Sequence, residues 1–428
     1  MTIEALYQIY LKYPRISTDT RKIQPGDIYV ALKGEHFNGN QFAHQALALG
    51  AAYCIVDESH GEPHPHIIRV ADSLGTLQSL AGYHRQQLSI PVIGITGSNG
   101  KTTTKELMAA VLRAQYRTTA TEGNLNNHIG VPLTLLSITP DTEIAIVEMG
   151  ANHAGEIAGY CRYARPDFAL INNCGKAHLE GFGSIEGVRR AKGELYDFIR
   201  EHDGTIFINN DLDYLQDMAR GITRRFSYGQ SNADIIGRDV SDTPLLKVAV
   251  LNHMLESEIR TRLTGSYNLP NVLAAIAVGI YFKIPIEAIR EALEAYVPGN
   301  SRSQWIKTGR NELILDAYNA NPSSMEAAIR NFAAIPAPSK ILLLGSMKEV
   351  GNYSTAEHQK VVDLCRELGL KQVFLVGSEF AAADMKGYPW FTDSLSLKTY
   401  IQSQQWRQQL ILIKGSRGSR MEVVTEAL

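Results

Sequence analysis

The segment Gly97–Thr102 has the residue types that bind a polyphosphate. It runs Gly-Ser-Asn-Gly-Lys-Thr and follows Val92–Thr96, a short β-branched run. Backbone N–H groups of a glycine-rich turn and the start of a helix can face an anion, a lysine can reach the outer phosphates, and a threonine hydroxyl can bind Mg²⁺. We therefore predict an ATP site whose nucleotide-binding residues include Gly97, Ser98, Asn99, Gly100, Lys101, Thr102 and Thr103.

This loop departs from the longer GxxxxGK[ST] pattern, which would need glycine at the position of Ile95. A short glycine-rich turn is weak evidence alone, because such turns also arise for purely conformational reasons. Its setting is stronger evidence, because a buried-strand pattern precedes it and apolar residues recur at helical spacing over Leu107–Leu112. The order strand, loop, helix favours the nucleotide site over a structural turn.

Two residues that could bind a metal also follow strand-like runs. Glu148 ends the run Ile144–Glu148, and His178 lies in the loop after Phe168–Asn172. Loops at the carboxyl ends of parallel strands hold ligands in open α/β sheets, and carboxylate oxygens suit Mg²⁺. The alternatives are an ordinary strand-end carboxylate and a histidine satisfied by its own surroundings. The phosphate-binding loop favours the functional role for both.

Two helical segments leave their polar residues open to two interpretations. Lys192 belongs to the basic segment Arg189–Glu194, whose spacing alone is typical of a solvated helix face. Asn271 precedes an apolar helix pattern, where it could cap the helix or hydrogen-bond a nucleotide base.

Further polar segments adjoin predicted strands. The amide-rich loop Gly123–His128 could bind phosphate or sugar hydroxyls, or only turn the chain. Asp316 ends a strand and could accept ribose hydroxyls, while Asn321-Pro322 could start the next helix. The segment Lys414–Arg417 follows the last strand and is either an anion site or a surface turn.

Short apolar runs alternate with helical patterns along the chain, which predicts an α/β protein. We expect a small N-terminal α/β domain over 1–88, a central nucleotide-binding domain with a mostly parallel sheet over 89–298, and a C-terminal Rossmann-like α/β domain over 299–428. Pro298–Asn300 is the expected second linker, and a polar, possibly antiparallel patch is expected over Arg225–Arg262.

Composition limits the function. The 428 residues are 44% hydrophobic and 20% charged with a formal net charge of −2, so no basic field favours nucleic acid or a membrane. The four cysteines are scattered, which favours reduced thiols in a cytoplasmic protein over disulfides or a zinc site. No signal peptide is evident, and the run Val272–Phe282 is too short to span a bilayer.

Several long blocks resemble the Mur ligase family, in the same order and over essentially the whole chain. They are TGSNGKTTTKE, GNLNNHIGVPLTLL, EMGANHAGEI, GKAHLEGFGS and RRAKGE in the central part, and DAYNANPSSM and KGSRGSRMEVV near the C-terminus. The segments Thr18–Arg21 and Pro25–Gly34 are similar to the family's nucleotide-sugar-binding signature. The C-terminal blocks most resemble the branch that joins D-alanyl-D-alanine to UDP-N-acetylmuramoyl-tripeptide.

The resemblance implies roles for single residues. Lys101 would hold the β- and γ-phosphates, Thr102 and Glu148 would bind one Mg²⁺, and His178 would help bind a second. Lys192 would match the lysine that is carbamylated in the family, since a carbamate is an anionic oxygen ligand whereas an ammonium repels Mg²⁺. Asn271 would meet the adenine, Arg302 the phosphates across the domain gap, and Asp316 the ribose. Lys101, His178 and Lys192 would thus be the catalytic residues.

The implied reaction is ATP-dependent amide formation through an acyl phosphate. The expected ligands are ATP, two Mg²⁺ ions, UDP-N-acetylmuramoyl-tripeptide and D-alanyl-D-alanine, with no nucleic acid or membrane insertion, and the family expectation is a monomer. Ser346 and Asn38 stand where the family usually has aspartate, and Arg302 lies in a loose form of the usual Gly-Arg element. Two alternatives are a related amide ligase, such as one like folylpolyglutamate synthetase, and an ATP-binding regulatory protein.

Overall fold

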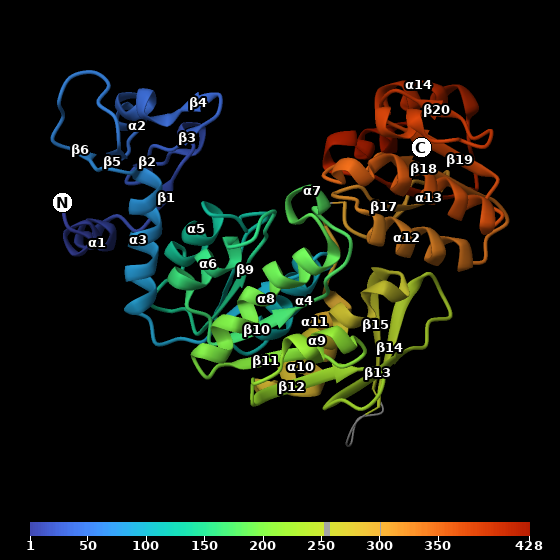
Figure 1. Ribbon diagram of the computed structural model, residues 1–428, viewed down its shortest axis with the longest axis horizontal. Helices are drawn as coiled ribbons and strands as arrows, with labels where there is room; N and C mark the ends of the chain where they lie inside the picture. Colours follow the sequence, from blue (N-terminus) through green and yellow to red (C-terminus); the bar gives the residue numbers. More distant parts are fainter. Residues whose placement is uncertain (252–256, 300) are drawn as a thin grey trace.

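The computed structural model describes residues 1–251, 257–299 and 301–428, and it contains three main sheets. Figure 1 shows them in chain order, with the regions of the first and third sheets rising from the ends of the middle one. We call these regions the N-terminal, central and C-terminal domains. Within the described residues, no helix is long and apolar enough to cross a membrane.

The N-terminal domain has a four-stranded parallel sheet in the order β1-β2-β5-β6. Helix α3 continues from it into the central domain, where Leu77 and Leu80 share one apolar core with Leu135 and Tyr160. The elements are α1 (Ile3–Lys12), β1 (Ile16–Ser17), β2 (Ile28–Val30), the hairpin β3 (Lys33–Gly34) and β4 (Phe37–Asn38), α2 (Ala43–Ala48), β5 (Tyr53–Val56), β6 (Ile67–Arg69) and α3 (Ser73–Gln86).

The central domain has a nine-stranded sheet in the order β15-β14-β13-β12-β11-β10-β7-β9-β8. Strands β7 to β13 pair in parallel, and β14 and β15 extend the edge antiparallel. The predicted polar patch is therefore partly antiparallel, and its residues 252–256 lie outside the described part. Strands β10, β7 and β9 are neighbours, so the loops that follow Ile171, Thr96 and Glu148 meet at one sheet edge.

Helices cover both faces of the central sheet, and each face has its own apolar core. The strands are β7 (Val92–Thr96), β8 (Thr118–Ala120), β9 (Ile144–Glu148), β10 (Phe168–Ile171), β11 (Thr205–Asn209), β12 (Arg224–Gly229), β13 (Ile235–Asp239), β14 (Leu245–Val250) and β15 (Ser257–Thr264). The helices are α4 (Lys101–Arg113), α5 (Gly130–Leu136), α6 (Glu156–Ala164), α7 (Leu179–Phe182), α8 (Ile185–Glu201), α9 (Asp213–Met218), α10 (Leu269–Tyr281) and α11 (Ile286–Ala295).

The C-terminal domain has a six-stranded sheet in the order β16-β17-β21-β18-β19-β20, parallel except for β16. Asn321 caps α12 through a capping box and Pro322 lies in its first turn, so the predicted helix start is confirmed. The elements are β16 (Gln304–Lys307), β17 (Glu312–Asp316), α12 (Pro322–Ala334), β18 (Lys340–Gly345), α13 (Ser354–Glu367), β19 (Gln372–Val376), β20 (Trp390–Phe391), α14 (Ser394–Gln404) and β21 (Leu410–Lys414).

The predicted α/β class and the mostly parallel central sheet are confirmed. The exact domain boundaries stay predictions, and Asn300 of the expected linker lies outside the described residues. All four cysteines are buried and free, in agreement with the prediction of reduced thiols.

His84 joins the N-terminal and central domains and should make their stability depend on pH. Its buried ring lies 3.1 Å from the Tyr7 hydroxyl through Nδ1 and 3.0 Å from the Ile138 carbonyl through Nε2, an arrangement that fits neutral imidazole. Burial lowers the pKa of His84. The unfolded chain therefore binds the proton more tightly, so the stabilisation is present above about pH 6.5 and decreases as the pH falls below it. Thermal unfolding between pH 5 and 8 should show this loss of stability at low pH. In His84→Gln, stability should depend less on pH over the same range.

Candidate active site

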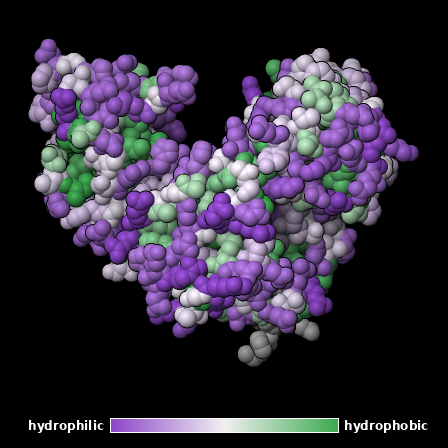
Figure 2. All heavy atoms as spheres, viewed as in Figure 1, coloured by the Kyte–Doolittle hydropathy of each residue, from purple (hydrophilic) through white to green (hydrophobic). Residues whose placement is uncertain are grey.

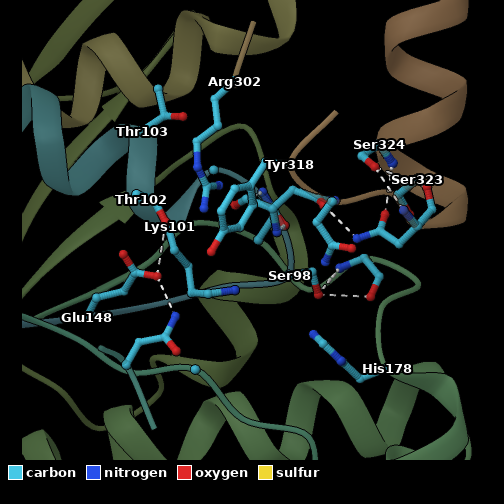
Figure 3. A pocket seen from close by; sticks show the side chains of 18 of the residues that line it. Ser98, Lys101, Thr102, Thr103, Glu148, His178, Arg302, Tyr318, Ser323 and Ser324 are labelled. Atoms are coloured by element: carbon cyan, nitrogen blue, oxygen red, sulfur yellow. Dashed lines mark hydrogen bonds between the residues drawn. The ribbon is translucent and has the colours of Figure 1, made fainter. Parts of the chain in front are cut away.

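A cavity of about 750 Å³ lies between the central and C-terminal domains. Figure 3 shows Lys101, Glu148 and His178 of the central domain together with Arg302 and Tyr318 of the C-terminal domain. Most of the predicted site residues line it, namely Ser98, Asn99, Gly100, Lys101, Thr102, Thr103, Glu148, His178, Asn271, Arg302 and Asp316. Gly97 and Lys192 are not among its lining residues.

The predicted phosphate-binding loop connects β7 to α4. Gly100 precedes the helix at φ 81°, a conformation that glycine adopts without steric cost. The Lys101 amine donates a 2.6 Å hydrogen bond to the Gly97 carbonyl, and burial lowers its pKa. A lysine held by the carbonyl of its own loop, beside the first turn of a helix, is placed to exchange that partner for a phosphate.

Alanine at position 100 should damage this loop. An added Cβ would lie 2.5 Å from Asn271 Oδ1 and would have to adopt positive φ. We expect Gly100→Ala to lower the free energy of unfolding by about 1–3 kcal/mol and to weaken ADP binding, as measured by urea unfolding and calorimetry. Gly123→Ala is the matched control, because Gly123 also has positive φ but no atom lies within 4 Å of its added Cβ. Gly123→Ala should lower the free energy of unfolding by less than Gly100→Ala does and should leave ADP affinity nearly unchanged. Equal losses of stability and of ADP affinity in the two variants would contradict the predicted clash.

Glu148 is fully buried at the end of β9, and its two carboxylate oxygens have different surroundings. Oε1 accepts hydrogen bonds from the Thr102 hydroxyl at 3.1 Å and from Asn126 Nδ2 at 2.7 Å. Oε2 is buried without a hydrogen-bond partner. A buried carboxylate oxygen left unpaired is costly unless a cation satisfies it, so the free oxygen of this carboxylate, whose other oxygen contacts the Thr102 hydroxyl, fits a divalent cation.

The described residues contain no cluster of three or more His, Cys, Asp or Glu side chains that could hold an ion alone. A magnesium ion here would therefore also need phosphate or water oxygens, which is how Mg²⁺ usually binds in phosphoryl-transfer sites.

Lys192 lies in α8 and is fully buried, so the solvated-face interpretation is wrong. Its amine has no hydrogen-bond partner and lies 5.7 Å from the centre of the Phe182 ring. Burial, aided by repulsion from Lys101, lowers the pKa of Lys192 to about 7. A neutral amine is the form that reacts with CO₂, so this environment fits a carbamylated lysine.

His178 precedes α7 with φ 51°, and its ring is directed into the cavity (Figure 3). Its Nδ1 lies 2.6 Å from Glu349 Oε2 of the C-terminal domain. This contact, opposed by burial, lowers the pKa of Glu349.

Asn271 lies inside the first turn of α10 and makes no cap, so the capping interpretation is wrong. Its Oδ1 accepts hydrogen bonds from Thr104 at 3.0 Å and Asn172 at 3.1 Å, and its Nδ2 donates to Asn268. The amide thus connects α10 to the loops around the phosphate site, while contact with a base stays a prediction.

The C-terminal domain contributes two cationic side chains to the cavity, Arg302 and Lys414, and their environments differ. The Arg302 guanidinium lies 3.6 Å from the centre of the Tyr318 ring, and its Nε is buried without a partner. Lys414 is buried and lies 2.5 Å from Asp316 Oδ2, so it is not part of a surface turn. Because Asp316 neutralises Lys414, Arg302 is the more available cation for a phosphate.

Direct contacts hold the two domains together around the cavity. Asn321 Nδ2 donates to Asn99 Oδ1 at 2.7 Å, and the Lys176 amine lies 3.0 Å from Glu357 Oε1. The Lys176 backbone N–H donates to the Ser323 hydroxyl at 3.0 Å. The cavity is therefore bounded by both domains, as a site for two reactants requires.

Sequence reasoning did not single out several residues that matter here. Asn126 lies in the amide-rich loop, but no spacing indicates that it reaches Glu148. Glu349 and Tyr318 belong to C-terminal segments whose partners lie far away in sequence. Of the family departures, Ser346 is buried, with its carbonyl accepting from the Ser416 hydroxyl, and Asn38 donates to Glu58 in the N-terminal domain. Neither residue is among those lining the cavity.

Three family models match the chain in order. They are "Mur ligase family, catalytic domain" over residues 12–79, "Mur ligase middle domain" over 95–279 and "Mur ligase, glutamate ligase domain" over 301–417. The chain is 38% identical to the UDP-N-acetylmuramoyl-tripeptide–D-alanyl-D-alanine ligase of Escherichia coli strain K12, over 96% of this chain and 93% of that protein. It is 36% identical to the ligase of the same name from Bacillus subtilis strain 168, over 96% and 92%.

Solved structures agree in fold. A crystal structure of MurF from Acinetobacter baumannii superposes with a TM-score of 0.88 at 31% identity, covering 99% of this chain and 98% of that one. The MurF ligase of Thermotoga maritima in complex with ADP superposes with a TM-score of 0.85 at 26% identity, covering 97% of each chain.

Proposed function

Because this chain belongs to the Mur ligase family, we propose that it joins D-alanyl-D-alanine to UDP-N-acetylmuramoyl-tripeptide at the expense of ATP, a cytoplasmic step of peptidoglycan precursor synthesis. The observation that carries this proposal is one cavity that combines a phosphate-binding loop, a buried carboxylate with a free oxygen and a cation from a second domain. The chain is 38% and 36% identical to two ligases of this name over 96% of its length, and this similarity supports the substrate pair.

The difficulty of the reaction is that a carboxylate must approach a triphosphate although both are anions. Lys101, the start of α4 and Arg302 all line the cavity, so both domains supply positive charge for the γ-phosphate. Bound Mg²⁺ would supply Lewis acidity at the phosphate oxygens, held by Thr102, Glu148, His178 and a carbamylated Lys192. Asp316 and Asn271 would hold the ribose and the adenine.

The chemistry has two steps. A terminal carboxylate oxygen of the tripeptide bonds to the γ-phosphorus, and the bond to ADP breaks. The amine of D-alanyl-D-alanine then attacks the acyl carbon and loses a proton, and the C–O bond breaks to release phosphate. The position of the cavity between two domains fits this order, because an acyl phosphate that is shielded from water survives until the amine arrives.

The shape of the molecule supports a long nucleotide-sugar substrate. Figure 2 shows a notch between the N-terminal and C-terminal domains above the central domain. We expect the uridine nucleotide to bind the N-terminal domain while the peptide extends along the notch into the cavity, and we expect a monomer to contain the whole site.

A substrate-pair assay tests the proposal. The full chain with ATP, Mg²⁺ and UDP-N-acetylmuramoyl-tripeptide should release one ADP per amide formed when D-alanyl-D-alanine is present, with little release for D-alanine or glutamate. Equal turnover with a single amino acid would favour a related amide ligase, including one like folylpolyglutamate synthetase. ATP binding without ADP release from any substrate pair would favour a regulatory protein.

A further inference from the structure

The contact between His178 and Glu349 joins two backbone segments that are both in unfavourable conformations. His178 has φ 51° and Glu349 has φ 63°, although neither is glycine. Left-handed backbone costs energy in non-glycine residues and persists where the surrounding structure requires it. Here the two segments come from different domains, and their side chains meet at 2.6 Å on the cavity wall.

A carboxylate beside Nδ1 determines what the other ring nitrogen can do. The contact is an ion-pair distance rather than a directed hydrogen bond, and its negative charge favours the tautomer with the proton on Nδ1, which leaves the Nε2 lone pair free to bind a cation. We propose that Glu349 is a positioning residue, supplied by the C-terminal domain, that fixes the tautomer and orientation of His178 for the metal bound with the nucleotide. This inference rests on the proposed function, because it takes His178 as a ligand of that metal.

The neighbouring contacts make this positioning dependent on domain docking. The loop that carries His178 also joins the C-terminal domain through Lys176, which pairs with Glu357 and donates its backbone N–H to Ser323. Glu349 can reach His178 only when the two domains are docked. Docking therefore completes the metal site as well as enclosing the substrates.

Glu357 provides a matched control. Its carboxylate also crosses the domain gap, but its ion-pair partners are Lys176 and Lys360 rather than His178. A general effect of weaker docking would appear in both Glu349→Ala and Glu357→Ala. A positioning effect would appear in Glu349→Ala, with Glu349→Gln between this variant and the parent, because glutamine keeps an acceptor oxygen but lacks the charge.

The experiment uses the full chain with ¹⁵N-labelled histidine, with the His178 signals assigned through His178→Gln. Nitrogen NMR should show the Nδ1–H tautomer in the parent and in Glu357→Ala, and a mixture of tautomers in Glu349→Ala. Mn²⁺ affinity in the presence of ADP, measured by electron paramagnetic resonance, should fall about 10-fold in Glu349→Ala and in His178→Gln.

An unchanged tautomer or Mn²⁺ affinity in Glu349→Ala, or an equal loss in Glu357→Ala, would overturn the inference. Neither readout requires amide formation, so failure of the inference can be distinguished from failure of the proposed function.

Discussion

Replacing Lys192 with alanine is expected to lower the rate of amide formation by about 10²- to 10³-fold while the protein stays folded, because several kcal/mol of charge stabilisation by a metal site depend on its ligands. The Lys192 amine is fully buried with no hydrogen-bond partner, so its removal deletes no ion pair. The substitution instead removes the proposed carbamate of Lys192, which is the only anionic metal ligand predicted in α8. Steady-state kinetics and thermal unfolding of the same preparation measure the two effects.

The carbamate interpretation adds two requirements to this prediction. A small carboxylate such as acetate should partly restore Lys192→Ala, because it can enter the vacated space and replace the lost oxygen ligands. Incubation of the parent with ¹³C-bicarbonate should give a carbamate NMR signal that weakens as the pH falls through about 7, where the amine becomes protonated. Full activity of Lys192→Ala would contradict the role of this residue.

Replacing Glu148 with glutamine should be about as damaging, at about 10²- to 10³-fold in kcat, with a higher Mg²⁺ requirement. The substitution preserves shape but removes the negative charge of the carboxylate whose unpaired Oε2 would face the proposed cation. It also places an amide beside the Thr102 hydroxyl and Asn126 Nδ2, where Oε1 accepts both hydrogen bonds. Rate measurements over a range of Mg²⁺ concentrations would show the effect.

Glu156→Gln is the matched control for Glu148→Gln. Glu156 lines the same cavity, but its carboxylate accepts hydrogen bonds from the backbone N–H groups of Asn152 and His153. A glutamine oxygen can keep these bonds, so we expect little change in the Mg²⁺ requirement. Equal defects in the two variants would show that charge in the cavity matters, rather than a specific ligand at Glu148.

The local parts of this site are predictable because the chain places them in one segment or on neighbouring strands. The predicted bounds of β7 and β9 agree with the structure, since each is a continuous apolar run ended by a polar residue or a turn. Parallel pairing of β7 with β9 and β10 then brings Lys101, Glu148 and the His178 loop to one edge. Strand order and this pairing rule are enough to expect a common cavity.

Other features of the site depend on tertiary packing, which the periodicity of the sequence does not indicate. Lys192 belongs to a basic helical segment, and only the packing of α8 shows that its amine is buried. Of the two interpretations of Asn271, capping is wrong, and Pro270 in the same turn indicates an earlier helix start. The contacts from Glu349 to His178 and from Asn321 to Asn99 join residues far apart in sequence, so they appear only when the domains are docked.

The central claim is that this site activates a carboxylate by phosphorylating it. The most direct test is one turnover of UDP-N-acetylmuramoyl-tripeptide whose terminal carboxylate carries ¹⁸O at both oxygens, with ATP and D-alanyl-D-alanine. Mass spectrometry should find one ¹⁸O in each released inorganic phosphate and the other in the new amide. Unlabelled phosphate, or label found in AMP, would contradict an acyl-phosphate route.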